Sequence, residues 1–303
     1  MKDLVIPSHI LIETVVGICN YRCIMCPIEE SVRREIMTNE TFIKILTKLQ
    51  PYLAHQRFLS ICGLGESLID KKVHEKIEAA KKFGFRGIGI YTNGELLSEE
   101  TSVKLLTSEL DSLIISIDGV TQSVQKSIRV RSHLSTVVSN VEQFIEIREE
   151  KKSKTKVIVR FTRQELNKHE ENDFCDFWRP RIRSEYGDII SIYSVHNFGR
   201  AAPDFKDKLS DNMLDRIRRG KLKCNEIYEN LLIAWDGSIK FCCGDQFGRY
   251  YIGNILYDDL AKLYNSRQYI DYRRMMEEGK ILNLEFCRNC SVPYSVVTKE
   301  VHR

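Results

Sequence analysis

The sequence lacks the features that define several large classes of protein. No apolar run approaches the roughly 18 residues of a membrane span, and the N-terminal residues hold no apolar signal-peptide core. The formal net charge is only +4, and no arm of about five or six like charges occurs, so we expect no nucleic-acid and no membrane partner. None of the seven histidines clusters with acids at triad-like intervals, so hydrolytic catalysis finds no support.

Cysteine, by contrast, is abundant, with ten residues in a chain of 303. Hydrophobic residues make up 43% and charged residues 29% of the chain, as in an ordinary globular protein with ample core. We expect a cytoplasmic protein, and in that compartment so many cysteines indicate metal or redox chemistry rather than a disulfide framework. The length allows one large domain, or a large domain followed by a small one.

Three of the cysteines lie close together after the apolar run 10–16, with C-x3-C-x2-C spacing: Cys19, Cys23 and Cys26. A loop this short can point three sulfurs at one centre but supplies no fourth. Structural zinc sites use four ligands, and ordinary electron-transfer iron–sulfur clusters are held by four cysteines. Three ligands and a vacancy instead describe a cluster with one iron open to an outside molecule. The alternative is a zinc site whose remaining ligand comes from elsewhere in the chain.

Short apolar segments alternate with helical patterns up to residue 195. The expected strands are 10–16, 57–62, 87–91, 113–117, 157–161 and 189–195. We expect helices from about residue 38 to Pro51, through 73–80, from about Ser98, and over 136–151 and 170–183. Such alternation is typical of an α/β fold whose parallel sheet is buried on both faces. Binding sites of these sheets lie at the carboxyl ends of the strands.

The composition changes near 197–207, a segment with Gly, Pro and no clear period, and we place a domain boundary after residue 205. Beyond it we expect a helix over 209–220, a hairpin over 231–242 and helices at 260–265 and 269–278. Four cysteines of this region end in a C-x2-C pair: Cys224, Cys242, Cys287 and Cys290. On ligand count alone, a zinc ribbon competes here with an iron–sulfur cluster.

The two cysteine sets together resemble those of radical S-adenosylmethionine (radical SAM) enzymes with a C-terminal SPASM/twitch extension. The resemblance implies a partial (β/α)6 TIM-like barrel of parallel strands over 1–205, followed by a small α+β iron–sulfur domain over 206–303. It implies a first 4Fe–4S cluster on the three early cysteines, whose open iron chelates the amino and carboxylate groups of SAM. The four later cysteines fit the shorter twitch form, which holds a second 4Fe–4S cluster.

The resemblance also implies contacts to SAM from residues beside the cysteine loop or at strand ends: Met25, Gly65, Glu66, Asn93, Ser116, Asp118 and Arg160. Gly65 and Glu66 belong to a turn similar to the GGE motif of the family, and Asp118 follows a strand whose end contacts ribose. Met25 stands where family members usually carry an aromatic residue near the adenine. Arg160 can pair with the SAM carboxylate or form an internal salt bridge.

The implied reaction is cleavage of SAM to a 5′-deoxyadenosyl radical, which removes hydrogen from a substrate carbon. We favour a small polar substrate, a sugar or an aminocyclitol, and a two-electron oxidation in which the auxiliary cluster accepts the second electron. An aminocyclitol-oxidising member of the family has a similar layout. The expected partners are the small-molecule substrate and a reductant such as flavodoxin or ferredoxin.

Two alternatives stay within the same family, and a third lies outside it. An epimerase would need a hydrogen-atom donor, for which Cys243 beside Cys242 is the candidate. Cys62 and Cys175 are expected to be small buried hydrophobes. A peptide-modifying enzyme is the second alternative, and we count the short stretch before Cys19 against it. The remote alternative is a non-catalytic iron–sulfur or zinc protein.

Overall fold

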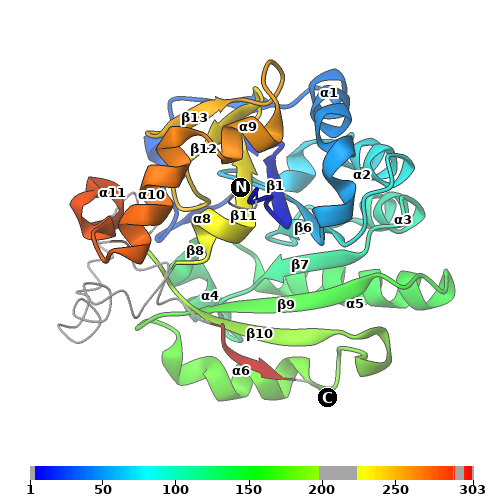
Figure 1. Cartoon of the computed structure of the whole chain (residues 1–303). Helices are drawn as coiled ribbons and strands as arrows, with labels where there is room; N and C mark the ends of the chain where they lie inside the picture. Colours follow the sequence, from blue (N-terminus) through cyan, green and yellow to red (C-terminus); the bar gives the residue numbers. More distant parts are fainter. Residues whose placement is uncertain (1–3, 198–223, 289, 291–296, 302–303) are drawn as a thin grey trace.

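The computed structural model describes residues 4–197, 224–288, 290 and 297–301, and it contains one ten-stranded sheet (Figure 1). Six strands form its parallel core: β1 (His9–Glu13), β5 (Phe58–Cys62), β6 (Ile88–Thr92), β7 (Ser112–Ser116), β9 (Lys156–Arg163) and β10 (Ile189–Ser194). Each strand of this series pairs in parallel with the next. All six predicted strands are present, and the α/β class with a partial TIM-like barrel is confirmed.

Helices follow most of these strands: α1 (Asn39–Leu49), α2 (Val73–Lys82), α3 (Glu99–Thr107), α4 (Gln122–Ile128), α5 (Leu134–Glu150) and α6 (Glu171–Trp178). All except α4 were predicted from the apolar periodicity. Side-chain caps fix three of their starts, because Thr38 accepts the Thr41 N–H before α1, Ser98 caps α3 and Thr121 caps α4. Helix α6 is shorter than predicted, since it ends two residues before Pro180.

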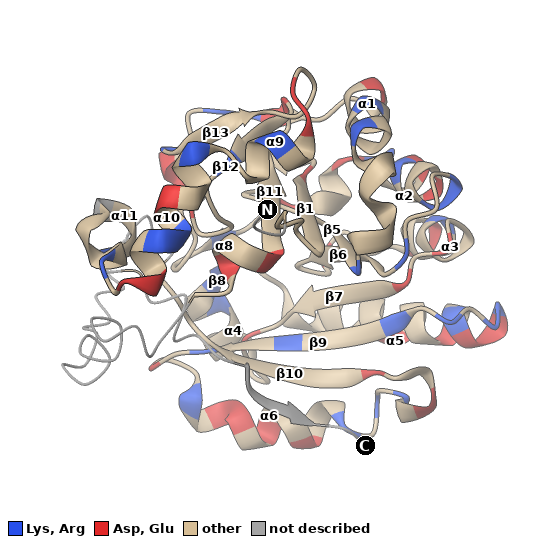
Figure 2. Cartoon of the chain, in the orientation of Figure 1, with Lys and Arg blue, Asp and Glu red and all other residues tan. Residues whose placement is uncertain are grey.

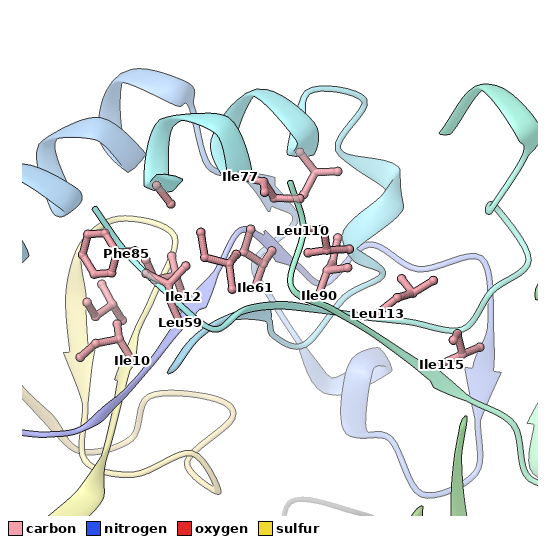
Figure 3. Close-up of a cluster of buried hydrophobic side chains, with 14 of the residues drawn as sticks. Ile10, Ile12, Leu59, Ile61, Ile77, Phe85, Ile90, Leu110, Leu113 and Ile115 are labelled. Atoms are coloured by element: carbon pink, nitrogen blue, oxygen red, sulfur yellow. The ribbon is translucent and has the colours of Figure 1, made fainter. Parts of the chain in front are cut away.

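Successive side chains along a barrel strand point alternately to the outer helices and to the inside of the barrel. On β9 the side chains of Val157, Val159 and Phe161 are fully buried against the helices, whereas Ile158 and Arg160 lie on the inner face of the barrel. Figure 3 shows the helix side of the sheet, where side chains of neighbouring strands gather near Ile77 of α2. Charged residues colour the outer helices in Figure 2 and are scarce on the central strands. Polar side chains on the inner face of the barrel are therefore exceptions in an otherwise apolar sheet.

The C-terminal region extends this same sheet. Its elements are α8 (Glu226–Glu229), β11 (Asn230–Ile233), β12 (Ser238–Lys240), β13 (Tyr251–Asn254), α9 (Leu260–Tyr264), α10 (Arg267–Glu277), α11 (Glu285–Arg288) and β14 (Val297–Val301). Strand β11 pairs in parallel with β1, and β14 pairs antiparallel with β10. The predicted hairpin is confirmed, since β11 and β12 pair antiparallel across Gly237, whose φ is +83°.

Two predictions for this region lie outside the described residues. These are the helix over 209–220 and most of the segment 197–207, where the domain boundary was placed. The division at residue 205 therefore stays a prediction. None of the described helices has the length and apolarity needed to cross a membrane.

Candidate active site

The loop with the first three cysteines leaves the carboxyl end of β1 and is anchored on both sides. Its short strand β3 (Arg22–Cys23) pairs antiparallel with β8 (Arg129–Val130), which sets Cys23 opposite Arg129. The Ile24 N–H donates to the Ile128 carbonyl at 2.9 Å, and the Cys26 N–H donates to the Cys23 carbonyl at 3.0 Å. The loop thus holds its three thiols in place through its backbone.

The three thiols lie within electrostatic range of one another. Burial raises the pKa of Cys19 to about 11 and that of Cys26 to about 12, and the charge of Cys23 adds to both effects. Burial also raises the pKa of Cys23, against the opposing charge of Arg129. Thiolates at these positions need a cationic centre beside them, as the irons of a cluster supply. The donor set therefore fits an iron–sulfur cluster.

A cavity of about 320 Å³ opens beside this loop at the carboxyl ends of the parallel strands. All three cysteines line it. It is also lined by six of the predicted cofactor contacts: Met25, Gly65, Glu66, Asn93, Ser116 and Arg160. The structure brings these residues together, while their contact with SAM stays a prediction.

The turn after β5 is shaped by a missing side chain and a buried acid. A Cβ on Gly65 would lie 2.6 Å from the Val15 carbonyl oxygen, so only glycine lets the turn approach the backbone just after β1. The Glu66 carboxylate accepts from the Asn93 N–H at 2.8 Å and from Thr92 Oγ1 at 2.7 Å. It also accepts from the Leu68 N–H at 3.0 Å. Glu66 lines the cavity, but most of its acceptor capacity already serves the protein.

Asn93 receives this support and reaches the cysteine loop. Its side-chain amide donates to Asn20 Oδ1 at 2.8 Å and lies 3.8 Å from Cys19 Sγ. Its own oxygen accepts the Glu95 N–H at 3.0 Å. The Glu66–Asn93 pair therefore braces the loop from the neighbouring strand end.

Asp118 does not line the cavity, although the sequence placed it among the cofactor contacts. The side chain is fully buried, and its Oδ1 accepts the Thr162 N–H at 2.7 Å. Its Oδ2 lies 2.8 Å from Arg129 Nε. Burial raises the pKa of Asp118, and the Arg129 guanidinium opposes that rise. In this position the carboxylate orients Arg129, and the predicted ribose contact is not supported by its placement.

Arg129 is the residue that the sequence reasoning missed. It lines the cavity, is only 7% exposed and places Nη1 3.8 Å from Cys23 Sγ. Arg129 follows directly after α4, and because that helix was not predicted, the position of Arg129 could not be predicted either. The available signal was Thr121, an N-cap residue seven residues before the last residue of α4, Ile128.

Two further residues occupy unpredicted environments. Arg160 has no carboxylate partner among the described residues. The central carbon of its guanidinium lies 4.3 Å from the centroid of the Tyr193 ring and 5.0 Å from that of the Tyr91 ring. The internal salt bridge that was one alternative for Arg160 is therefore not seen among the described residues. Cys62 was predicted to be a small buried hydrophobe, but it lies in the cavity wall. Burial raises the pKa of its thiol to about 12.

The four C-terminal cysteines also act on one another. After burial, the charges of Cys287, Cys290 and Cys224 are the next causes that raise the pKa of Cys242. Cys242 is buried beside an aromatic group that includes Phe241. No three Cys, His, Asp or Glu side chains in the described residues are spaced around a single metal-ion position. The assignment of a second cluster thus depends on the donor set.

Cys243 follows this set but does not line the cavity. Its Sγ lies 2.7 Å from Glu226 Oε2, to which it donates a hydrogen bond. Burial raises the pKa of Cys243 well above that of an ordinary thiol, and the Glu226 charge adds to the effect. Its predicted role as a hydrogen donor therefore has no support from its position.

Comparison with known proteins agrees with both halves of this arrangement. The model of the Radical SAM superfamily matches residues 14–167, which is half of the chain. The model of the SPASM iron–sulfur cluster-binding domain matches residues 224–291. Both predicted cysteine sets lie within these two segments.

Curated relatives share only part of their length with the chain. It is 29% identical over 168 residues to a "Probable GTP 3',8-cyclase" of Methanothermobacter marburgensis, covering 55% of this chain and 53% of that protein. It is 28% identical over 134 residues to the "Tungsten-containing aldehyde ferredoxin oxidoreductase cofactor-modifying protein" of Pyrococcus furiosus, covering 44% of this chain and 37% of that protein. The chain thus spans about half or less of the length of these relatives.

Solved structures show the same fold over most of the chain. BtrN in complex with AdoMet and 2-DOIA has a TM-score of 0.66 at 17% identity, covering 99% of this chain and 100% of that chain. Streptococcus suis SuiB bound to precursor peptide SuiA has a TM-score of 0.62 at 15% identity, covering 96% and 71%. The family models imply 4Fe–4S clusters and SAM as cofactors. The chain therefore belongs to the radical SAM superfamily and is a radical SAM enzyme with a SPASM domain.

Proposed function

We propose that this enzyme is an oxidoreductase of the dehydrogenase type, which removes two electrons from a small polar substrate, a sugar or a cyclitol. The observation that carries the proposal is the cavity at the strand ends, which has the cysteine loop on one wall and polar side chains on the others. A second set of four mutually interacting thiols supports it, because four-cysteine ligation leaves no vacancy and suits electron transfer.

We assign a separate role to each group of residues that lines the cavity or holds a cluster. Cys19, Cys23 and Cys26 would hold one 4Fe–4S cluster, and the four later cysteines a second. With SAM bound, these clusters would supply the electron that generates a hydrogen-abstracting radical and an acceptor for the second electron. Arg129 presents a guanidinium beside Cys23, where it can hold the SAM carboxylate in bidentate fashion. Asn93 keeps the cysteine loop in position.

Two comparisons bear on this proposal. The structure of BtrN contains AdoMet and 2-DOIA, and that of SuiB contains a precursor peptide. At 17% and 15% identity both likenesses show the fold alone, and the proposal takes up the small-molecule ligand of the first. The proposal includes a small one-electron carrier, a flavodoxin or ferredoxin, as the reductant of the first cluster.

A second candidate is an epimerase, and Cys62 favours it. An epimerase must return a hydrogen atom to the substrate radical, and a thiol is a suitable donor. Cys62 lies in the cavity wall whereas Cys243 does not, so Cys62 replaces Cys243 as the donor in this alternative. A dehydrogenase has no need of this thiol.

Anaerobic turnover in heavy water separates the two candidates. The reconstituted enzyme is incubated with SAM, a reductant and a panel of sugars and cyclitols, and the products are weighed by mass spectrometry. Oxidation removes two hydrogens and introduces no solvent deuterium at carbon, while epimerisation adds one deuterium. Cys62→Ala should retain oxidation. A product with one deuterium, lost in Cys62→Ala, would establish the epimerase instead.

A further inference from the structure

The cysteine loop contains a buried tyrosine that the proposed function does not use. Tyr21 lies between Cys19 and Cys23, is only 1% exposed and lines the cavity. Its hydroxyl donates a hydrogen bond to Glu95 Oε2, in the turn that follows β6. Tyr21 therefore ties the cysteine loop to a different part of the barrel.

Glu95 is itself held on more than one side. Its Oε2 accepts the His133 backbone N–H at 3.1 Å, and its Oε1 lies 2.8 Å from Nδ1 of the same histidine. Its backbone carbonyl accepts from the Asn140 side chain at 3.2 Å. His133 directly precedes α5, and Asn140 lies within that helix. The carboxylate that receives the Tyr21 hydroxyl is therefore fixed by α5.

Packing alone would need only the ring of Tyr21. A buried hydroxyl loses its hydration, and a hydrogen bond such as the one to Glu95 offsets that cost. A bond from a hydroxyl to a carboxylate is charge-assisted and directional, so it fixes the residue that donates it. The turn after β6 makes a second contact nearby, because the Asn93 side chain donates to Asn20 Oδ1 at 2.8 Å. One turn thus holds two successive residues of the cysteine loop.

The backbone N–H of Tyr21 is the part of this arrangement that contacts a cysteine sulfur. It donates to Cys19 Sγ at 3.3 Å. Hydrogen bonds to the ligand sulfurs help to set the reduction potential of an iron–sulfur cluster, and they favour the reduced form because it is more negative. Partners that orient metal ligands also strengthen metal binding. A displacement of Tyr21 would therefore change both the potential and the retention of a cluster held by Cys19.

We propose that Tyr21, held by Glu95, is a positioning residue for the first cluster. The hydrogen bond between the two side chains fixes the N–H group that donates to Cys19 Sγ, and it thereby raises the reduction potential of the cluster and slows its loss. This inference rests on the part of the proposed function that assigns a cluster to the first cysteine set. It is independent of the substrate.

Conservative variants separate the hydrogen bond from the charge of the acid. Tyr21→Phe removes only the hydroxyl. Glu95→Gln loses the charge but keeps an oxygen that accepts from Tyr21, whereas Glu95→Asp keeps the charge and loses the reach of one methylene. Tyr52→Phe is the matched control, because Tyr52 also donates to a carboxylate, that of Asp259 at 2.5 Å, and neither residue lines the cavity.

The measurements use each protein after anaerobic reconstitution with iron and sulfide. Electron paramagnetic resonance of the reduced protein is recorded with and without SAM, and the signal that SAM alters is assigned to the cluster with an open iron. Redox titration of that signal gives the midpoint potential of the first cluster. Its decay in the presence of an iron chelator gives the rate of cluster loss.

We expect the signal to decay roughly tenfold faster in Tyr21→Phe and in Glu95→Asp than in the parent, with a lower midpoint potential in both. Glu95→Gln and Tyr52→Phe should decay at the rate of the parent, and the potential of Glu95→Gln should be no lower than that of the parent. Tyr21→Phe combined with Glu95→Asp should decay no faster than Tyr21→Phe alone, because both changes break the same bond.

Three results would overturn the proposal. The first is a Tyr21→Phe protein that decays at the rate of Tyr52→Phe, and the second is an unchanged midpoint potential in Tyr21→Phe. The third is fast decay in Glu95→Gln, because the charge of Glu95 would then matter beyond its hydrogen bond. Circular dichroism establishes that each variant is folded, and the comparison of Glu95→Asp with Glu95→Gln provides the test if Tyr21→Phe is not.

Failure of this proposal and failure of the proposed function give different results. A parent without any signal that responds to SAM would refute the cluster assignment, and this inference with it. If the parent has the signal and Tyr21→Phe retains it unchanged, only this inference fails.

Discussion

A buried ion pair ties the C-terminal region to the first strand of the barrel. Lys240 on β12 places Nζ 2.9 Å from Glu13 Oε2 at the end of β1, and the two side chains are 4% and 1% exposed. Lys240 also donates to the Gln246 carbonyl at 2.9 Å, and Glu13 Oε1 accepts the Leu64 N–H at 3.0 Å. Every charged atom of the pair is thus compensated inside the protein.

Lys240→Met should therefore destabilise the fold severely. It keeps most of the side-chain volume but leaves the Glu13 carboxylate buried without its counter-charge, which costs roughly 3–5 kcal/mol. In a protein of this size that loss corresponds to a fall of roughly 6–15 °C in unfolding temperature. Glu13→Gln combined with Lys240→Met should recover much of it, because Gln keeps the oxygen that accepts the Leu64 N–H.

The assay is anaerobic thermal unfolding of the reconstituted protein, followed by circular dichroism at one scan rate for the parent, both single variants and the double variant. Lys104→Met is the matched control, since Lys104 pairs with Glu100 on the exposed face of α3 and its loss should leave the transition unchanged. Additive effects of the two single variants, or a Lys240→Met protein as stable as the parent, would refute the reasoning.

Two other results are expected. Replacing the first cysteine set by alanine should remove about half of the iron and all SAM cleavage, measured by iron and sulfide analysis and by product formation; full iron retention would contradict it. The buried neutral His196 has a lowered pKa, so its contribution to stability is present above about pH 6.5 and is lost as the pH falls towards 4. As the pH falls from about 6.5 towards 4, the free energy of unfolding of the parent should therefore drop more steeply than that of His196→Gln. Parallel plots of unfolding free energy against pH for the two proteins would contradict this.

Much of the fold could be predicted because its signals are local. Each barrel strand is a short apolar run followed by a polar turn, and residues such as Ile10 and Ile12 on β1 are fully buried on the helix side. The short α4 gave too few turns for a periodic signal. The pairing of β11 with β1, which aligns His9 with Asn230, joins segments from opposite ends of the chain, and no local pattern encodes such a register.

The candidate site was predictable as a location more than as a set of contacts. Strand-end position placed Gly65, Glu66 and Asn93 around one cavity. Which residues face that cavity depends on side-chain direction and on pairing across the fold. Arg129 was missed for this reason, because its place beside Cys23 follows from the β3–β8 pair, between segments far apart in the sequence.

The position of Asp118 has a simple electrostatic basis. With a cluster bound, the three cysteines would be thiolates, so a carboxylate facing them directly would be repelled, whereas a guanidinium or an amide would be attracted. The structure has Arg129 and Asn93 next to the thiols, and an acid behind each of them: Asp118 pairs with Arg129, and Glu66 accepts the Asn93 N–H. Both acids therefore orient the groups that contact the loop. A strand-end acid in a sequence of this kind indicates the site, while the neighbouring cation or amide makes the contact.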